Sequence, residues 1–233
     1  MIARLTGNRS KKDDDSTPLS VAGAALIELI TFVHVSVSGL KDATHARQII
    51  HWNRMAKKVL GERDPLAPEE QYTDAIRDAE RVEVFAKTEA RYNFPYLYGM
   101  AATRLWSILE TMVDDLIAYL LQTRPECTQT DLVRKLEGPL VEFASATEEE
   151  RANYLAEALT EQLKARFKLG VGRFEAVLNQ IGVGGPVDSD VQRAILELSQ
   201  IRHVIIHRLG KADHSFTLRC FGTCSSWIGV SPL

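Results

Sequence analysis

The chain has 233 residues, of which 45% are hydrophobic and 25% are charged, and its formal net charge at pH 7 is −3. This length suffices for one good-sized domain or a domain with an extension, and the composition is typical of a globular protein. The small negative charge excludes a global basic field for nucleic acid, so RNA binding would need a local basic patch. The cysteines, Cys127, Cys220 and Cys224, form no disulfide framework and indicate a cytoplasmic location.

The N-terminal part is predicted to be a disordered leader followed by a helical extension. Residues 1–20 are polar, with basic residues ahead of an acidic run, and are predicted to be disordered. Residues 21–40 are apolar enough to raise the question of a membrane span, but Glu28 and His34 interrupt them, and the acidic run is atypical of a signal peptide. We therefore predict a buried helix here and no membrane partner. A second helix, over residues 42–61, completes an extension of residues 21–62.

The remainder of the chain also predicts helices, so the expected fold class is all-α. Residues 61–68 contain prolines and are a candidate linker. A charged helix over residues 69–91 ends before Pro95, and the strongest apolar helix, over residues 96–122, carries Trp106. Thr147 and Glu150 have the spacing of a capping box. Further helices are predicted over residues 130–143 (interrupted near Gly138-Pro139), 147–168 and 172–181, and a short strand is possible at residues 215–221.

The segment from residue 189 to residue 209 holds the candidate site. Ser189 and Gln192 predict a capping box at its start. His203 and His207 are four residues apart, so they share one helix face, roughly opposite an apolar stripe. Arg202 lies at the edge of the stripe and is splayed from His207 by about 140° on a straight helix. The stripe consists of Val191, Ala194, Ile195, Leu198, Ile201, Ile205 and Leu209.

Arg202 and His207 enclose four residues, and a polar residue directly follows the arginine. This arrangement resembles the R-x4-6-H motif of HEPN (higher eukaryotes and prokaryotes nucleotide-binding) domains. Residues 173–185 and 97–116 resemble the helices that pack against the motif helix in prokaryotic members, and residues 212–220 also fit. The resemblance covers roughly residues 94–221. It implies a HEPN-like helical bundle over residues 69–221, with residues 222–233 as a C-terminal tail.

The resemblance also implies a function, that of a metal-independent endoribonuclease that acts as a homodimer with a composite active site. Such an enzyme would act as a toxin with a cognate antitoxin or as a phage-defence effector. His207 would be the general acid or base, Arg202 would hold the phosphate, and His203 would position RNA or share the proton transfer. Arg208 and Lys211 would bind the substrate backbone. This chemistry requires no cofactor and no metal, because the RNA supplies its own 2′-hydroxyl nucleophile. Leu196 and Val204 lie nearer the histidines than the stripe does and are candidates for the dimer interface.

Alternatives remain open at this point. The chain could be a HEPN-like module that only binds RNA or nucleotide, or only dimerises, and the motif could also be coincidental in a helical scaffold. Cys220 and Cys224 with His207 and His214 could form a zinc site, although the cysteine spacing is not that of a common zinc module. One carboxylate of the Trp106 helix could orient a motif residue, but a solvated or ion-paired carboxylate is the usual case. These carboxylates are Glu110, Asp114 and Asp115.

Overall fold

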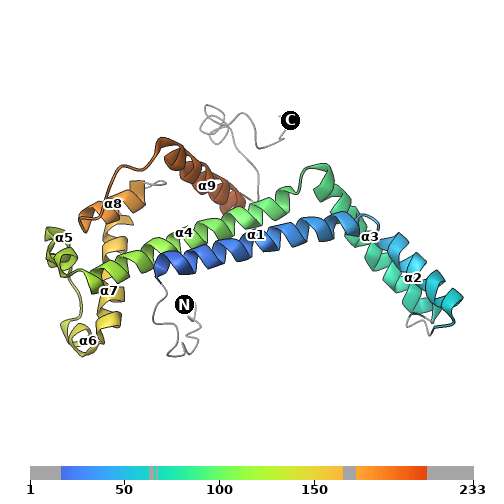
Figure 1. Ribbon diagram of the computed structural model, residues 1–233, viewed down its shortest axis with the longest axis horizontal. Coiled ribbons are helices and arrows are strands. Elements are labelled where there is room, and N and C mark those ends of the chain that lie inside the picture. Colours follow the sequence, from blue (N-terminus) through green and yellow to red (C-terminus); the bar gives the residue numbers. More distant parts are fainter. Residues whose placement is uncertain (1–16, 63–65, 67, 165–171, 209–233) are drawn as a thin grey trace. The chain divides into compact units, whose positions relative to one another are not determined.

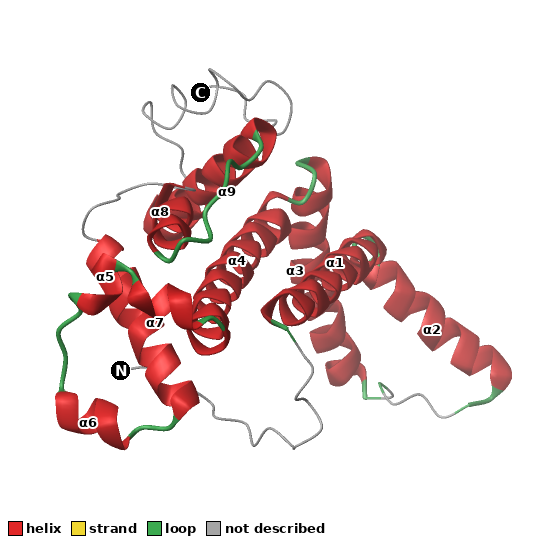
Figure 2. Ribbon diagram, turned by 60° about the vertical axis from the view of Figure 1, so that its left-hand side comes forward, coloured by secondary structure: helices red, strands yellow, loops and turns green. Residues whose placement is uncertain are grey.

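The computed structural model describes residues 17–62, 66, 68–164 and 172–208. These residues form helices joined by turns and contain no strand, which confirms the predicted all-α class (Figure 2). The possible strand at residues 215–221 lies outside the described residues. In chain order the elements are α1 Pro18–Ala43, α2 Ala46–Leu60, α3 Glu69–Arg91, α4 Pro95–Thr123, the 3-10 helix η1 Pro125–Gln129, α5 Asp131–Arg134, α6 Leu140–Ser145, α7 Glu148–Lys164, α8 Gly172–Gln180 and α9 Ser189–Arg208 (Figure 1).

The boundary between α3 and α4 is set by local chemistry. Asn93 and Phe94 both have positive φ, at 59° and 58°, which turns the chain sharply after α3. Pro95 then occupies the first position of α4, where its fixed φ suits a helix start. The buried Glu89 carboxylate accepts hydrogen bonds from the backbone N–H groups of Tyr96 (3.3 Å) and Leu97 (3.2 Å). A side chain of the preceding helix therefore caps α4.

The predicted capping box at the start of α7 is confirmed. The Thr147 hydroxyl accepts a hydrogen bond from the Glu150 backbone N–H (3.3 Å), and the Glu150 carboxylate accepts one from the Thr147 backbone N–H (2.8 Å). The predicted interruption near Gly138-Pro139 is also present, because α5 ends at Arg134 and α6 begins at Leu140. Pro125 ends α4, as its sequence predicts, and opens η1.

The chain divides into two compact units, residues 1–27 with 105–203 and residues 28–104 with 204–233. The first unit has a core to which α4, η1, α7 and α8 contribute the most completely buried side chains. Trp106 of α4 packs on Phe174 of α8, with ring centroids 5.7 Å apart. The largest fully buried side chains are Ile117, Cys127, Leu159, Val177 and Ile181.

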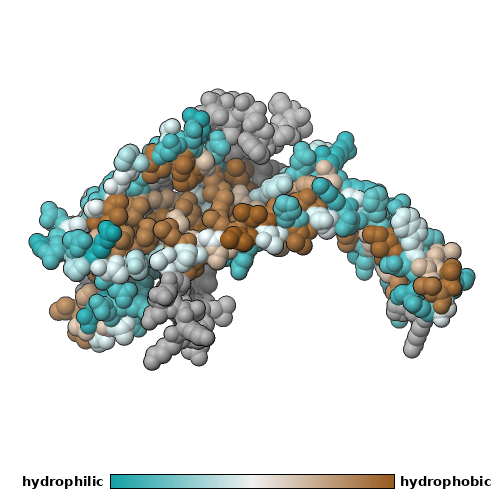
Figure 3. Space-filling model, viewed as in Figure 1, coloured by the Kyte–Doolittle hydropathy of each residue, from teal (hydrophilic) through white to brown (hydrophobic). Residues whose placement is uncertain are grey.

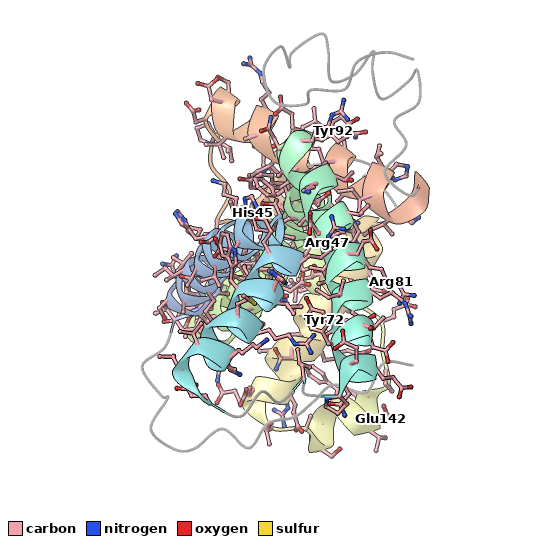
Figure 4. All side chains as sticks on the ribbon, turned by 90° about the vertical axis from the view of Figure 1, so that its right-hand side faces the viewer. His45, Arg47, Tyr72, Arg81, Tyr92 and Glu142 are labelled. Atoms are coloured by element: carbon pink, nitrogen blue, oxygen red, sulfur yellow. The ribbon has the colours of Figure 1, made fainter. Side chains whose placement is uncertain are left out.

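In the second unit, α2 and α3 form an antiparallel hairpin (Figure 1). Arg47 of α2 donates from Nε to Glu83 Oε2 (2.9 Å) and pairs with Glu80 (3.3 Å). Arg54 of α2 pairs with Glu69 of α3 (2.9 Å). In Figure 4, Arg47 projects from α2 toward α3. Ion pairs therefore link α2 to α3, and residues 61–68, the predicted linker, connect these two paired helices.

The predicted burial of the first helix is wrong. Of α1, which begins at Pro18, only Ala22 is buried, whereas Ile30, Phe32 and Val35 are 59–66% exposed. Apolar residues lie around the whole circumference of α1, so neighbouring helices that pack on one side leave the others uncovered. Among the described residues, α1 is also the one helix that is long and apolar enough to cross a membrane.

Candidate functional site

Helix α9 carries the motif, and its start differs in detail from the prediction. Asp188, rather than Ser189, caps the helix: its Oδ1 accepts hydrogen bonds from the backbone N–H groups of Asp190 (2.8 Å) and Val191 (3.4 Å). The Gln192 side chain does not close a capping box but donates to Glu175 Oε1 of α8 (3.0 Å). A carboxylate caps a helix as well as a hydroxyl does, and the sequence has one of each here, at Asp188 and Ser189. Gly210, the predicted end signal, lies outside the described residues.

Both units hold α9 through apolar contacts. Ile195 and Leu198 pack against the core of the first unit. In the second unit, Ile205 lies so close to α4 that a Cβ atom on Gly99 would be 3.1 Å from Ile205 Cδ1. The lack of a side chain at Gly99 therefore lets α9 approach α4 closely. These contacts use the predicted stripe and fix which face of α9 turns outward.

The outward face of α9 carries both motif histidines. His203 and His207 are exposed, as the helical period predicts, and they are one turn apart. Leu196 and Ile206 share this face and are 45% and 44% exposed. We call these four residues the histidine face. Val204, a predicted interface residue, is instead buried at 7% exposure, because its position on the helix turns it toward the chain interior.

Arg202 is half-buried at the edge of the apolar stripe, where the sequence placed it. Its guanidinium carbon Cζ lies 5.9 Å from the centroid of the Trp106 ring, within the range of a cation–π contact. Arg202 Nε and Trp106 Nε1 are both buried and have no hydrogen-bond partner among the described residues. Two neighbouring donors without acceptors make this a donor-rich position that suits an anion.

The helix that contains Trp106 is expected to pack against the motif helix, but the sequence does not include Trp106 itself in the site. The sequence predicted Trp106 as core or interface, and it is 5% exposed. Its contact with Arg202 joins positions that are distant in the chain, so no local pattern indicates it. Of the α4 carboxylates, Asp114 accepts a hydrogen bond from the Thr160 hydroxyl of α7 (3.4 Å).

Several predicted site residues cannot be placed. Arg208 is the last residue of α9, and its side chain is not described. Lys211, His214, Cys220 and Cys224 lie outside the described residues, so the substrate-binding and zinc predictions that use them stay predictions. Within the described ranges, no group of three or more His, Cys, Asp or Glu side chains is placed to hold a metal ion.

An open pocket of about 160 Å³ is present in the first unit, away from the motif residues. Its lining includes Asp115 and Gln122 of α4 and Glu149 and Asn153 of α7. It contains neither Arg202 nor a histidine, so the candidate chemistry belongs to the outward surface of α9 and not to this pocket.

Comparison with protein-family models, with curated proteins and with solved structures finds no match to the chain.

Proposed function

We propose that the protein is a metal-independent endoribonuclease with a HEPN-like helical bundle, and that the histidine face of α9 forms its active site in a homodimer. The observation that carries this proposal is that two exposed histidines, one turn apart, share a helix with an arginine whose guanidinium lies over Trp106. Imidazole and guanidinium groups suit catalysis on a phosphodiester, whereas a purely structural helix gains little from exposed histidines.

The reaction divides its tasks among these side chains. A base takes the proton of the RNA 2′-hydroxyl, and the 2′-oxygen attacks the adjacent phosphorus. An acid gives a proton to the departing 5′-oxygen, so the products are a 2′,3′-cyclic phosphate and a 5′-hydroxyl end. His207 is the proposed acid or base, with His203 positioning RNA or sharing the proton transfer. Arg202 offers its remaining N–H donors to the phosphate oxygens as negative charge builds up.

A homodimer supplies the geometry that one helix lacks. Arg202 and His207 are splayed by about 140° on α9, so one phosphate cannot easily meet both side chains of the same chain. A two-fold axis beside the histidine face brings Arg202 of one copy toward His207 of the other. The exposure of Leu196 and Ile206 beside the histidines favours this, because a second copy would cover both apolar side chains. Arg208 and Lys211, close in sequence, are proposed to bind the RNA backbone.

The test is a cleavage assay on a mixed RNA with EDTA present. His207→Ala should lower the cleavage rate by about a hundred- to ten-thousand-fold, the usual effect of losing a general acid or base. His45→Ala is a matched control, since His45 is exposed at the start of α2 and makes no side-chain capping bond there. A His207→Ala protein that cuts as fast as wild type would refute the assignment. Wild-type protein that binds RNA but cuts none would instead favour the binding-module alternative.

Mixing two inactive variants tests whether the site is composite. If Arg202 of one chain works with His207 of the other, an Arg202→Ala and His207→Ala heterodimer contains one site with both wild-type residues. Random exchange makes about half of the dimers heterodimers, so the mixture should regain about a quarter of wild-type activity. No recovery after verified subunit exchange would place the site within a single chain.

A further inference from the structure

Helix α2 presents its polar side to α3 and its apolar side outward. Arg47, His51 and Arg54 all contact α3: Arg47 and Arg54 through ion pairs, and His51 through a 3.2 Å contact between its Nδ1 and the Tyr72 hydroxyl. The apolar residues lie about 140° around the helix from these contacts. They form the outer face of α2, which consists of Ile49, Trp52, Met55, Val59 and Leu60, at exposures from 41% to 82%.

This arrangement differs from that of a helix that packs on its own protein through an apolar face. No residue of α2 is fully buried, and Ala46 and Ile50 alone among its apolar residues are half-buried, so most of its apolar surface is not used in the hairpin. Arg54 also stacks on Tyr72, with Cζ 3.9 Å from the ring centroid. Polar contacts thus hold α2 on α3 and leave the outer face of α2 exposed, where it can contact another apolar surface.

The outer face of α2 continues directly from α1. Only Thr44 and His45 separate the two helices. In the part of α1 that belongs to the same unit, Ile30 and Val35 are 63% and 66% exposed and lie on different sides of the helix. Figure 3 shows hydrophobic residues gathered along α1. Exposed apolar residues therefore occur on two helices that follow each other in the chain.

We infer that this surface contacts a lipid bilayer, with the exposed side of α1 and the outer face of α2 both lying at the headgroup boundary. The half-buried residues Leu29, Val33 and Leu40 share one side of α1, which packs on the chain itself. Val35 lies off that side and is 66% exposed, so an apolar side of α1 remains for lipid. This inference is an alternative to the sequence-based expectation of no membrane partner.

The composition of α2 supports the same surroundings. Helix α2 contains no acidic residue, and its basic residues Lys57 and Lys58 lie near its end. An amphipathic helix with tryptophan on the apolar face and lysines on the other is typical of the interface of anionic membranes. Glu28 and His34 are the ionisable residues within the apolar part of α1, and a charge at Glu28 opposes contact with lipid.

The inference is tested by floating the full-length protein with vesicles of phosphatidylcholine and phosphatidylglycerol. Wild-type protein should float with the vesicles, and an alkaline carbonate wash, which removes proteins bound only to the surface, should release it. Val35→Asp should lower the floated fraction, because it places a charge on the lipid-facing side of α1. Trp52→Glu and Val59→Asp should lower the floated fraction through the outer face of α2. Glu28→Gln should raise the floated fraction, because it removes a charge from the exposed side of α1.

The matched control is Val84→Asp, which places the same charge on α3 at a valine that is 62% exposed but outside this surface. It should float like wild type. Three outcomes would overturn the inference: wild-type protein that stays out of the vesicle fraction, equal loss for Val84→Asp and Val59→Asp, or mature protein that has lost α1 to cleavage as a secretion signal. A fourth outcome would also overturn it: the protein does not bind vesicles but forms an oligomer that Trp52→Glu dissociates. That result would show that this surface contacts a second copy of the chain. RNA cleavage assayed in detergent is independent of these results, so the two proposals can fail separately.

Discussion

Replacing Glu89 by alanine should destabilise the junction between α3 and α4. Glu89 is 4% exposed, and its carboxylate accepts the backbone N–H groups of Tyr96 and Leu97 at 3.3 and 3.2 Å. The residue at the usual capping position, Phe94, has no polar side chain. Alanine at position 89 therefore leaves both N–H groups of the first turn of α4 without this acceptor, and the Leu97 bond lies in a buried environment.

The expected cost follows from these two groups. Loss of a helix cap costs about 1 kcal/mol. A buried N–H left without an acceptor adds about 1 to 2 kcal/mol. The total of about 2 to 3 kcal/mol should lower Tm by about 4 to 12 °C in a chain of this size. Glu89→Gln keeps an acceptor oxygen but loses its charge, so it should cost about 1 kcal/mol, since neutral hydrogen bonds are roughly half as strong as charge-assisted ones.

Thermal unfolding followed by circular dichroism measures both variants. Glu157→Ala is the control, because Glu157 is exposed on α7 and its loss should change the free energy of unfolding by no more than about 0.5 kcal/mol. The order of stability should be wild type, then Glu89→Gln, then Glu89→Ala. If Glu89→Ala is as stable as Glu157→Ala, the α4 cap contributes nothing and the reasoning is wrong.

Three further variants test electrostatics and capping elsewhere in the chain. Hydrogen bonds from Arg47 and then Lys87 lower the pKa of Glu83 from its usual 4.5 to about 2. A lowered pKa stabilises the fold above pH 4.5 and loses that contribution as the pH falls toward 2. In urea unfolding at a series of pH values, Glu83→Gln should therefore be less stable than wild type at pH 7, and the difference in stability should shrink below pH 4.5. A difference that does not vary with pH would contradict this. Asp188→Ala should lower the stability by about 1 kcal/mol because it removes the α9 cap, whereas Ser189→Ala should cost less. If thermal melts show that Ser189→Ala is the more destabilising, Ser189 is the cap, as the sequence predicts.

The sequence by itself determined several of the helix boundaries. The charged helix was predicted over the residues that α3 occupies, and Pro95 and Pro125 mark the limits of α4. The capping box of Thr147 and Glu150 was read from spacing alone and is present. These features depend on contacts between residues close in the chain, so a local pattern contains the information.

The outward direction of the motif histidines was also predictable, because it follows from the period of the apolar stripe. The direction of Val204 was not: it lies between the stripe and the histidines on the helix, and only packing decides which side it joins. Val204 is buried and Ile206 is exposed. The contact of Arg202 with Trp106 likewise requires α4 and α9 to be placed beside each other.

The tertiary structure alone decided the surroundings of α1 and α2. Apolar sequence predicted burial for α1, but hydrophobicity states only that a residue prefers an apolar environment, not that its own chain provides one. For α2, the ion pairs from Arg47 to Glu83 and from Arg54 to Glu69 turn the polar side toward α3. Those partners are far apart in sequence, and their pairing leaves Trp52 on the outside. The sequence therefore determined that α2 has two faces, and contacts across the hairpin determined which face points outward.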